Sequence, residues 1–142
     1  MQIAFKKATK SLSKKIDSLP HTKLDEILPD EIRKAMAVLK IKQRSRLLGC
    51  LSSIISQKAT QEGDLPSLKA WLLNGAVQDL RGKNLPFSKI VDLSKKIYAL
   101  NEKIKEQKKK KLKSSQHEDD LEEKINVLLG YAELIDRELY FR

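Results

Sequence analysis

The residue types that most often perform catalysis or bind metal ions are few in this 142-residue chain. The two histidines, His21 and His117, do not have the spacing of a metal-binding pair. The single cysteine, Cys50, has no nearby histidine to activate it, and we interpret it as a small buried hydrophobic residue. No glycine-rich phosphate loop is present, nor a Ser/His/Asp order in a recognisable context. The sequence therefore predicts no enzymatic activity and no cofactor.

An acidic cluster occupies residues 118–123. Carboxylates are the ligands that hard cations prefer, but consecutive residues of a helix point in different directions and do not converge on one ion. We therefore interpret the cluster as the solvated start of a helix and predict no metal site.

Basic residues dominate the charge of the chain. Lysine and arginine number 29 against 19 aspartates and glutamates, which gives a net charge of +10. The basic residues are concentrated in residues 1–60 and 87–113, whereas residues 114–142 are net acidic. Such segregation favours a polyanionic partner over a uniformly solvated surface. Lysine far outnumbers arginine, which favours contact with phosphates over the reading of bases, since bidentate recognition is chiefly a property of arginine.

Three basic segments are candidate contact surfaces for nucleic-acid phosphates: a helix near the N-terminus, residues 40–46, and a lysine run at residues 108–113. The alternative for the first two is a solvated surface, with lysine stems covering apolar flanks. Part of the lysine run could serve only to complement the dipole at a helix C-terminus. The residues predicted to contact phosphates are Lys6, Lys10, Lys14, Lys42, Arg44, Arg46, Lys109, Lys110 and Lys113.

The lysine run lies between two apolar stripes that predict long helices folded back on each other. Both stripes step alternately by three and four residues, which is the repeat of a seam packed against another helix. Ser115, three residues before Glu118, has the spacing of a capping box at the start of the second helix. The stripe residues are Ile90, Leu93, Ile97, Leu100 and Ile104 in the first helix, and Leu121, Ile125, Leu128, Ala132, Ile135 and Leu139 in the second.

Shorter helices are expected before this hairpin. Apolar spacing predicts a helix over residues 3–18 and a helix beginning at Pro29. Residues 30–56 could form one helix or two, and we favour two with residues 40–46 as a basic joint. A polar linker is expected at residues 57–63, then a helix over 65–73 capped by Asp64, with Trp71 as a core anchor. Gly75 and Gly82 bracket a predicted short helix over residues 76–81.

These patterns predict an all-α fold, a compact helical bundle of about five to seven helices with a long C-terminal antiparallel helical hairpin. Residues 1–142 form one domain, with a basic helical part at 1–86 and the hairpin at 87–142. No apolar run is long enough to cross a bilayer and no secretory signal is apparent, so we expect a cytoplasmic protein, or a nuclear one in a eukaryote.

Two functions fit these features. The first is a small basic protein that binds the phosphate backbone of nucleic acid with little sequence specificity and no catalysis. The alternative is an assembly subunit whose hairpin, residues 87–139, pairs with helices of another protein and whose positive charge meets an acidic partner. We expect no membrane partner, and the sequence leaves DNA versus RNA and the oligomeric state open.

Overall fold

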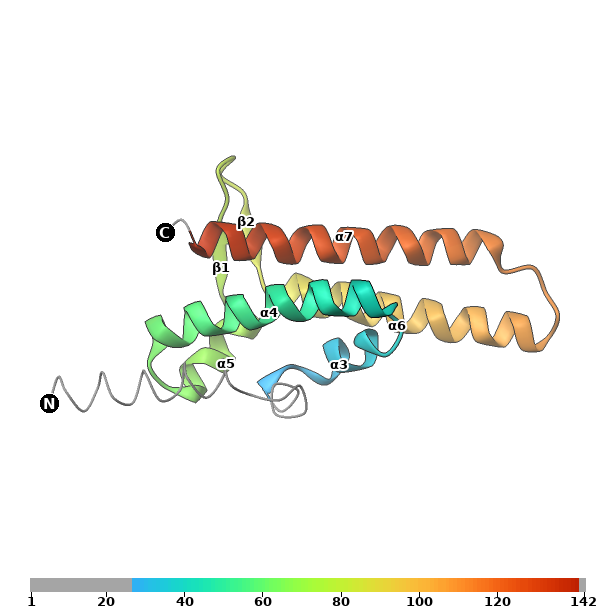
Figure 1. Ribbon diagram of the computed structural model, residues 1–142, viewed down its shortest axis with the longest axis horizontal. Coiled ribbons are helices and arrows are strands. Elements are labelled where there is room, and N and C mark those ends of the chain that lie inside the picture. The colour runs from blue at the N-terminus through green and yellow to red at the C-terminus, as the bar shows by residue number, and fades with distance from the viewer. Residues whose placement is uncertain (1–26, 141–142) are drawn as a thin grey trace, which may run out of the picture.

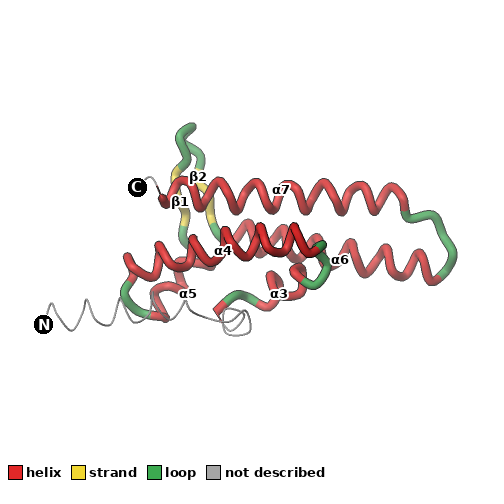
Figure 2. Tube along the Cα trace, viewed as in Figure 1, coloured by secondary structure: helices red, strands yellow, loops and turns green. Residues whose placement is uncertain are grey.

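The computed structural model describes residues 27–140. Within this range the chain is mostly helical, in agreement with the predicted all-α class, and it adds one small sheet. The predicted helix at residues 3–18, with Lys6, Lys10 and Lys14, lies outside the described residues. The described elements are α3 (Asp30–Met36), α4 (Ile41–Glu62), α5 (Leu65–Asn74), β1 (Ala76–Gln78), β2 (Asn84–Pro86), α6 (Ser88–Lys109) and α7 (Ser115–Tyr140) (Figures 1 and 2).

Three long helices, α4, α6 and α7, form the body of the described chain. α7 packs against both α4 and α6, and α3 packs against α6. α6 and α7 lie side by side and run in opposite directions, and residues 110–114 join them at one end of the molecule (Figure 1). The two strands lie near the other end of α7 (Figure 1). The lysine run and the small sheet are therefore at opposite ends of these helices.

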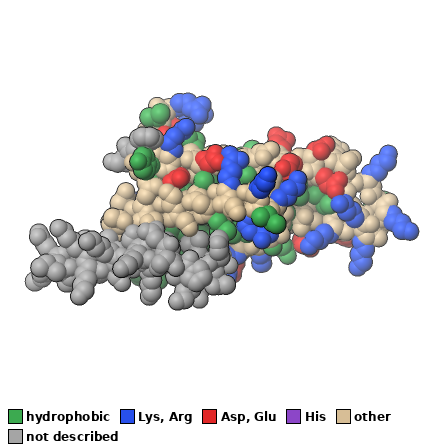
Figure 3. Space-filling view, viewed as in Figure 1, with side chains coloured by type: hydrophobic (Ala, Val, Ile, Leu, Met, Phe, Trp, Pro, Cys, Tyr) green, Lys and Arg blue, Asp and Glu red, His purple; other side chains and the backbone are tan. Residues whose placement is uncertain are grey.

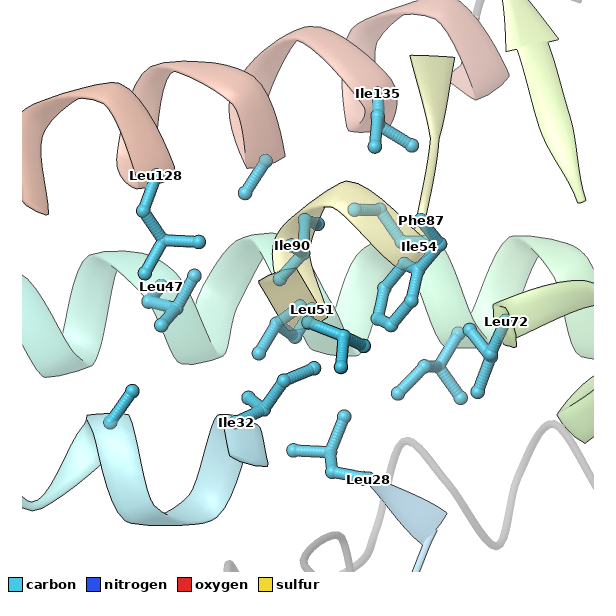
Figure 4. Close-up of a cluster of buried hydrophobic side chains, with 14 of the residues drawn as sticks. Leu28, Ile32, Leu47, Leu51, Ile54, Leu72, Phe87, Ile90, Leu128 and Ile135 are labelled. Carbon is cyan, nitrogen blue, oxygen red and sulfur yellow. The ribbon is translucent and has the colours of Figure 1, made fainter. Parts of the chain in front are cut away.

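The apolar stripes of α6 and α7 lie in the core. Ile90, Ile97 and Leu128 are fully buried, and Leu93 and Leu100 are half-buried. The core also receives side chains from the other helices, among them Ile32 of α3, Leu51 and Ile54 of α4 and Leu72 of α5, which gather around Phe87 at the start of α6 (Figure 4). Trp71 is half-buried against this cluster, and its ring centroid is 6.3 Å from that of Phe87, in agreement with its predicted role.

Residues 30–56 form two helices, as we favoured, but residues 40–46 are not the joint between them. The chain turns at residues 37–40, and the basic segment forms the first turns of α4. Lysine, glutamine and arginine are good helix formers, and the Gln43 side chain accepts a hydrogen bond from the Lys40 backbone N–H at 3.0 Å. The prediction that residues 40–46 form a basic joint between two helices is therefore wrong.

The polar linker predicted at residues 57–63 is also wrong, because α4 continues through it. Ala59 is fully buried and extends the apolar face of the helix by one turn. α4 ends at Glu62, and the backbone N–H of the following residue, Gly63, donates to the Ala59 carbonyl. α5 then begins as expected, with the Asp64 carboxylate accepting a 2.8 Å hydrogen bond from the Ser67 N–H.

A β-hairpin replaces the short helix predicted for residues 76–81. β1 and β2 are antiparallel, with Val77 opposite Leu85, and both of these side chains are buried while most of their neighbours are exposed. This alternation is the signature of a half-buried strand, and the six-residue window is too short to show it clearly beside two glycines. Gly75 has an extended rather than a left-handed conformation, and a Cβ there would lie 2.1 Å from Trp71 Cδ1.

The predicted capping box at Ser115 and Glu118 does not form. α7 begins at Ser115 itself, and the Glu118 N–H donates to the carbonyl of Ser114 at 2.9 Å. The Glu118 carboxylate instead pairs with Lys108 Nζ at 2.7 Å. This ion pair joins the last turn of α6 to the first turn of α7.

Candidate nucleic-acid interface

Six of the nine predicted phosphate contacts lie in the described residues, and they fall on two separate elements. Lys42, Arg44 and Arg46 are on the first turns of α4, whereas Lys109, Lys110 and Lys113 lie at the end of α6 and in the loop that follows. Figure 3 shows basic side chains projecting around the loop end of the α6–α7 pair. The structure therefore offers two basic surfaces whose side chains can be compared one by one.

The two arginines of α4 both bind groups of this chain. Arg44 donates from Nε to the Met36 carbonyl at 3.0 Å and from Nη2 to the Leu39 carbonyl at 3.2 Å. These two carbonyls lie at the end of α3 and in the turn that follows it. Arg46 donates from Nε to the carboxylate of Glu133 on α7. This hydrogen bond raises the pKa of Arg46 and lowers the pKa of Glu133. Of the three candidates on α4, Lys42 alone is exposed without an acidic partner in residues 27–140.

The lysine run is an ordered helix end. The Leu112 N–H donates to the Gln107 carbonyl at 2.8 Å, and the Lys111 N–H donates to the Lys108 carbonyl at 3.1 Å. Together with the left-handed backbone of Lys111, at φ 58°, these two bonds form a Schellman motif. Its left-handed position is usually a glycine, so a lysine there is unusual.

Ion pairs use only part of the charge in this run. Lys108 pairs with Glu118, and Lys110 Nζ lies 3.0 Å from a Glu106 carboxylate oxygen. Lys109, Lys111 and Lys113 are exposed, with no acidic partner among the residues that the structure describes. Two of the lysines thus serve the helix ends, and three extend into solvent.

A row of lysines along α6 was not predicted. Lys89, Lys96 and Lys103 are seven residues apart, so they lie along one side of α6 at intervals of about 10.5 Å. All three are exposed and have no acidic partner in the described part of the chain, and the same spacing leads on to Lys110. The signal was available in the sequence, because the row has the same seven-residue repeat as the buried isoleucines of α6. We call these three residues the α6 lysine row.

Other kinds of site find no support in residues 27–140. No group of three or more His, Cys, Asp or Glu residues in this range is placed to hold a metal ion. No described helix is both long and apolar enough to span a bilayer. Cys50 is half-buried, and burial is the main cause that raises the pKa of its thiol to about 11, so little of the reactive thiolate is present at neutral pH.

No family model, curated protein or solved structure matches this chain. The assignment of function therefore rests on the charged surfaces described above.

Proposed function

We propose that this protein is a small, basic, non-catalytic protein that binds nucleic acid through the phosphate backbone with little sequence specificity. The observation that carries the proposal is the set of exposed lysines without acidic partners on α6 and in the lysine run. Among residues 27–140 they are Lys89, Lys95, Lys96, Lys103, Lys109, Lys111 and Lys113. Each lysine that neutralises a phosphate releases condensed counterions, and this release supplies most of the affinity in non-specific binding.

The contacts of Arg44 and Arg46 within this chain support low specificity. Arginine makes the commonest specific contact with a base, the bidentate pair with guanine, whereas lysine acts as a point charge. Arg44 and Arg46 already bind groups of this chain. Trp71 is an unsuitable platform for base stacking, because it packs against the core and Lys58 Nζ lies 4.8 Å from its ring centroid.

The proposal also includes the detailed architecture and the cellular compartment expected from the sequence. We take α6 and α7 as a long antiparallel helical hairpin within one compact helical bundle, and residues 1–142 as one domain. The helices would then hold the α6 lysine row and the lysine run in a fixed relation to each other. A protein with this role would act in the cytoplasm, or in the nucleus of a eukaryotic cell.

A salt titration of binding tests the proposal on duplex DNA, single-stranded DNA and structured RNA. If all seven exposed lysines contacted a B-form duplex, the slope of log K against log salt would reach about −6. We expect a steep slope that changes little with base sequence. A slope near zero on all three substrates would overturn the proposal.

The contribution of each surface can be measured with two matched triple variants. One changes Lys89, Lys96 and Lys103 to Gln, and the other changes Lys109, Lys111 and Lys113 to Gln. Each variant removes three charges from exposed positions, so the fold should persist and the slope on duplex DNA should flatten by up to about 2.7. If the wild-type slope is steep and neither variant changes it, these lysines are not the contact surface.

The alternative role is that of an assembly subunit. Its predicted docking stripes are largely buried inside this chain, so a protein partner would need another surface. One candidate is the outer side of the net acidic helix α7, where Val127 is 51% exposed. Binding that survives high salt and selects one protein, with no affinity for nucleic acid, would favour this alternative.

A further inference from the structure

The β-hairpin ends in an apolar side chain beside basic residues. Leu80 lies in the turn between β1 and β2 and is 90% exposed, the most exposed large hydrophobic residue among those described. Arg81 and Lys83, in the same turn, are also exposed, and Arg81 Nε lies 3.9 Å from a carboxylate oxygen of Asp79. Figure 1 shows the strands extending beyond α7 to the turn, and Figure 3 shows basic and hydrophobic side chains together at that end of the molecule.

The base of the hairpin is fixed to the helices. Val77 and Leu85, which face each other across the two strands, are both buried in the core. The Tyr131 hydroxyl of α7 donates a 3.1 Å hydrogen bond to the Pro86 carbonyl at the end of β2. Burial raises the pKa of Tyr131 to about 12, so the hydroxyl keeps its proton at neutral pH. The hairpin is therefore anchored by side chains on both strands.

The turn itself is held by the buried carboxylate of Asp79. Its Oδ1 accepts hydrogen bonds from the N–H groups of Arg81 and Lys83, at 2.9 and 2.7 Å. The Gly82 N–H donates to the Asp79 carbonyl, and the left-handed φ of Gly82, 80°, completes a type I turn with a glycine bulge. Leu80 is thus presented in a fixed position and not at the end of a loose loop.

We propose that the β1–β2 turn is a wedge that enters the minor groove of duplex DNA, where Leu80 presses between base pairs and Arg81 and Lys83 bind the flanking phosphates. This inference rests on the proposed nucleic-acid function and adds a bent duplex as the preferred ligand. Leucine is one of the apolar residues that open base steps in this way, and the cost of unstacking is offset by the contacts that a bent duplex gains. In this proposal the exposed lysines of α6 and the lysine run supply most of the affinity, so the leucine has only to open a base step.

The charge beside Leu80 selects a polyanion as its partner over an apolar protein groove. Leu80 is the single apolar residue of the turn, residues 79–83, and so offers little to an apolar groove. Cations beside an apolar wedge suit a groove lined by phosphates. An anionic membrane surface has similar charge, but stable attachment to a membrane requires far more buried apolar area than a single leucine provides. Duplex DNA is therefore the occupant to which the turn is best matched.

Bending of a labelled duplex tests the inference with the full chain. A duplex of about 25 base pairs carries a donor and an acceptor dye at its ends, and a kink of about 20–90° brings the ends closer and raises energy transfer. We expect saturating wild-type protein to raise the transfer. Leu80→Ser should bind with a similar salt slope but lose the increase, and Leu80→Met should restore it. Circular dichroism of all variants should be unchanged, because the side chain makes little contact with the protein.

Leu112→Ser is the matched control. Leu112 is 57% exposed and also lies between basic residues, Lys111 and Lys113, but in the loop between helices. This variant should bend the duplex as the wild type does, whereas a loss of bending with Leu112→Ser and not with Leu80→Ser would overturn the proposal. Changing Arg81 and Lys83 to Gln should flatten the salt slope by up to about 1.8.

The outcomes separate the wedge from the proposed function. Steep, salt-dependent binding without a change in energy transfer would overturn the wedge and leave the proposed function standing. No binding to DNA or RNA would overturn both. Sedimentation with phosphatidylserine vesicles that is lost in Leu80→Ser, together with wild-type bending that persists in that variant, would show that the turn contacts a membrane surface instead.

Discussion

Arg46 on α4 donates a hydrogen bond to the carboxylate of Glu133 on α7, although the two residues are 87 positions apart in the chain. Both side chains are partly exposed, at 52% and 42%, so the contact lies at the surface where the two helices meet. A phosphate could bind Arg46 only by displacing this carboxylate or by approaching its negative charge. The arginine therefore belongs to the packing of α4 on α7 more than to an open basic surface.

The first prediction compares Arg46 with Lys42, one turn earlier on the same helix. Arg46→Gln should lower the melting temperature slightly and leave the salt slope of DNA binding unchanged. Lys42→Gln should leave the melting temperature unchanged and flatten the slope by about 0.7–0.9 if that residue contacts a phosphate. Thermal melts and salt titrations of the two variants measure both effects. A flattened slope for Arg46→Gln would show that the arginine leaves Glu133 when nucleic acid binds.

The second prediction concerns pH. The hydrogen bond from Arg46 holds the pKa of Glu133 below its ordinary value of about 4.3. A lowered folded-state pKa means that the contribution to stability is complete above that ordinary value and is lost as the pH falls through the folded-state pKa. The melting temperature of Glu133→Gln should therefore lie below that of the wild type at pH 7, and the gap should narrow below about pH 4. Melts from pH 7 to pH 3 measure it, and a gap that widens in acid would contradict the assigned direction.

The third prediction uses two neighbouring residues of α7, one buried and one exposed. Leu128 is fully buried, and Leu128→Asp would bury an unpaired charge at a cost of several kcal/mol, a large part of the usual folding stability of about 5–15 kcal/mol. Val127 is half-exposed, so Val127→Asp should be tolerated. Ile97→Asp on α6 should behave like Leu128→Asp. Circular dichroism melts decide the matter: if Leu128→Asp and Val127→Asp melted alike, the assigned face of α7 would be wrong.

Helix-forming stripes were predictable because their apolar spacing records which face is buried. Ile97, Leu128 and Trp71 lie where the sequence places them. The β-hairpin was not predictable by the same means, because glycines such as Gly75 and Gly82 are found both at the ends of short helices and in the turns of β-hairpins. What decides between them is tertiary: the burial of Val77 and Leu85, and the close approach of Trp71 to Gly75.

The candidate interface was likewise predictable only in part. Exposure of the lysine run was predictable because Leu112 is its single apolar residue, and the α6 lysine row could have been found from its spacing. The contacts of Arg44 and Arg46 could not have been predicted, because their partners are backbone carbonyls or a residue distant in the sequence. Composition counts a cation but does not show whether a carboxylate from another helix already binds it.

The last prediction concerns the left-handed residue in the lysine run. A residue with a Cβ at positive φ is strained, and Lys111, at φ 58°, holds the position that glycine usually takes in a Schellman motif. Lys111→Gly should relieve this strain and raise the stability by up to about 1 kcal/mol. Glycine also raises the conformational entropy of the unfolded chain, which offsets part of this gain. The same change removes a solvent-facing cation, so it should flatten the salt slope on duplex DNA by about 0.9.

Lys113→Gly is the matched control, because Lys113 carries the same charge but is not at positive φ. It should flatten the salt slope by a similar amount and lower the stability, since glycine adds freedom to the unfolded chain without relieving strain. Denaturant unfolding gives the two stabilities and salt titration gives the two slopes. A Lys111→Gly protein that is more stable and binds less steeply would show that a strained lysine is kept in the loop for its charge. Equal slopes for the wild type and both variants would exclude these two lysines from the contact, whatever their effect on stability.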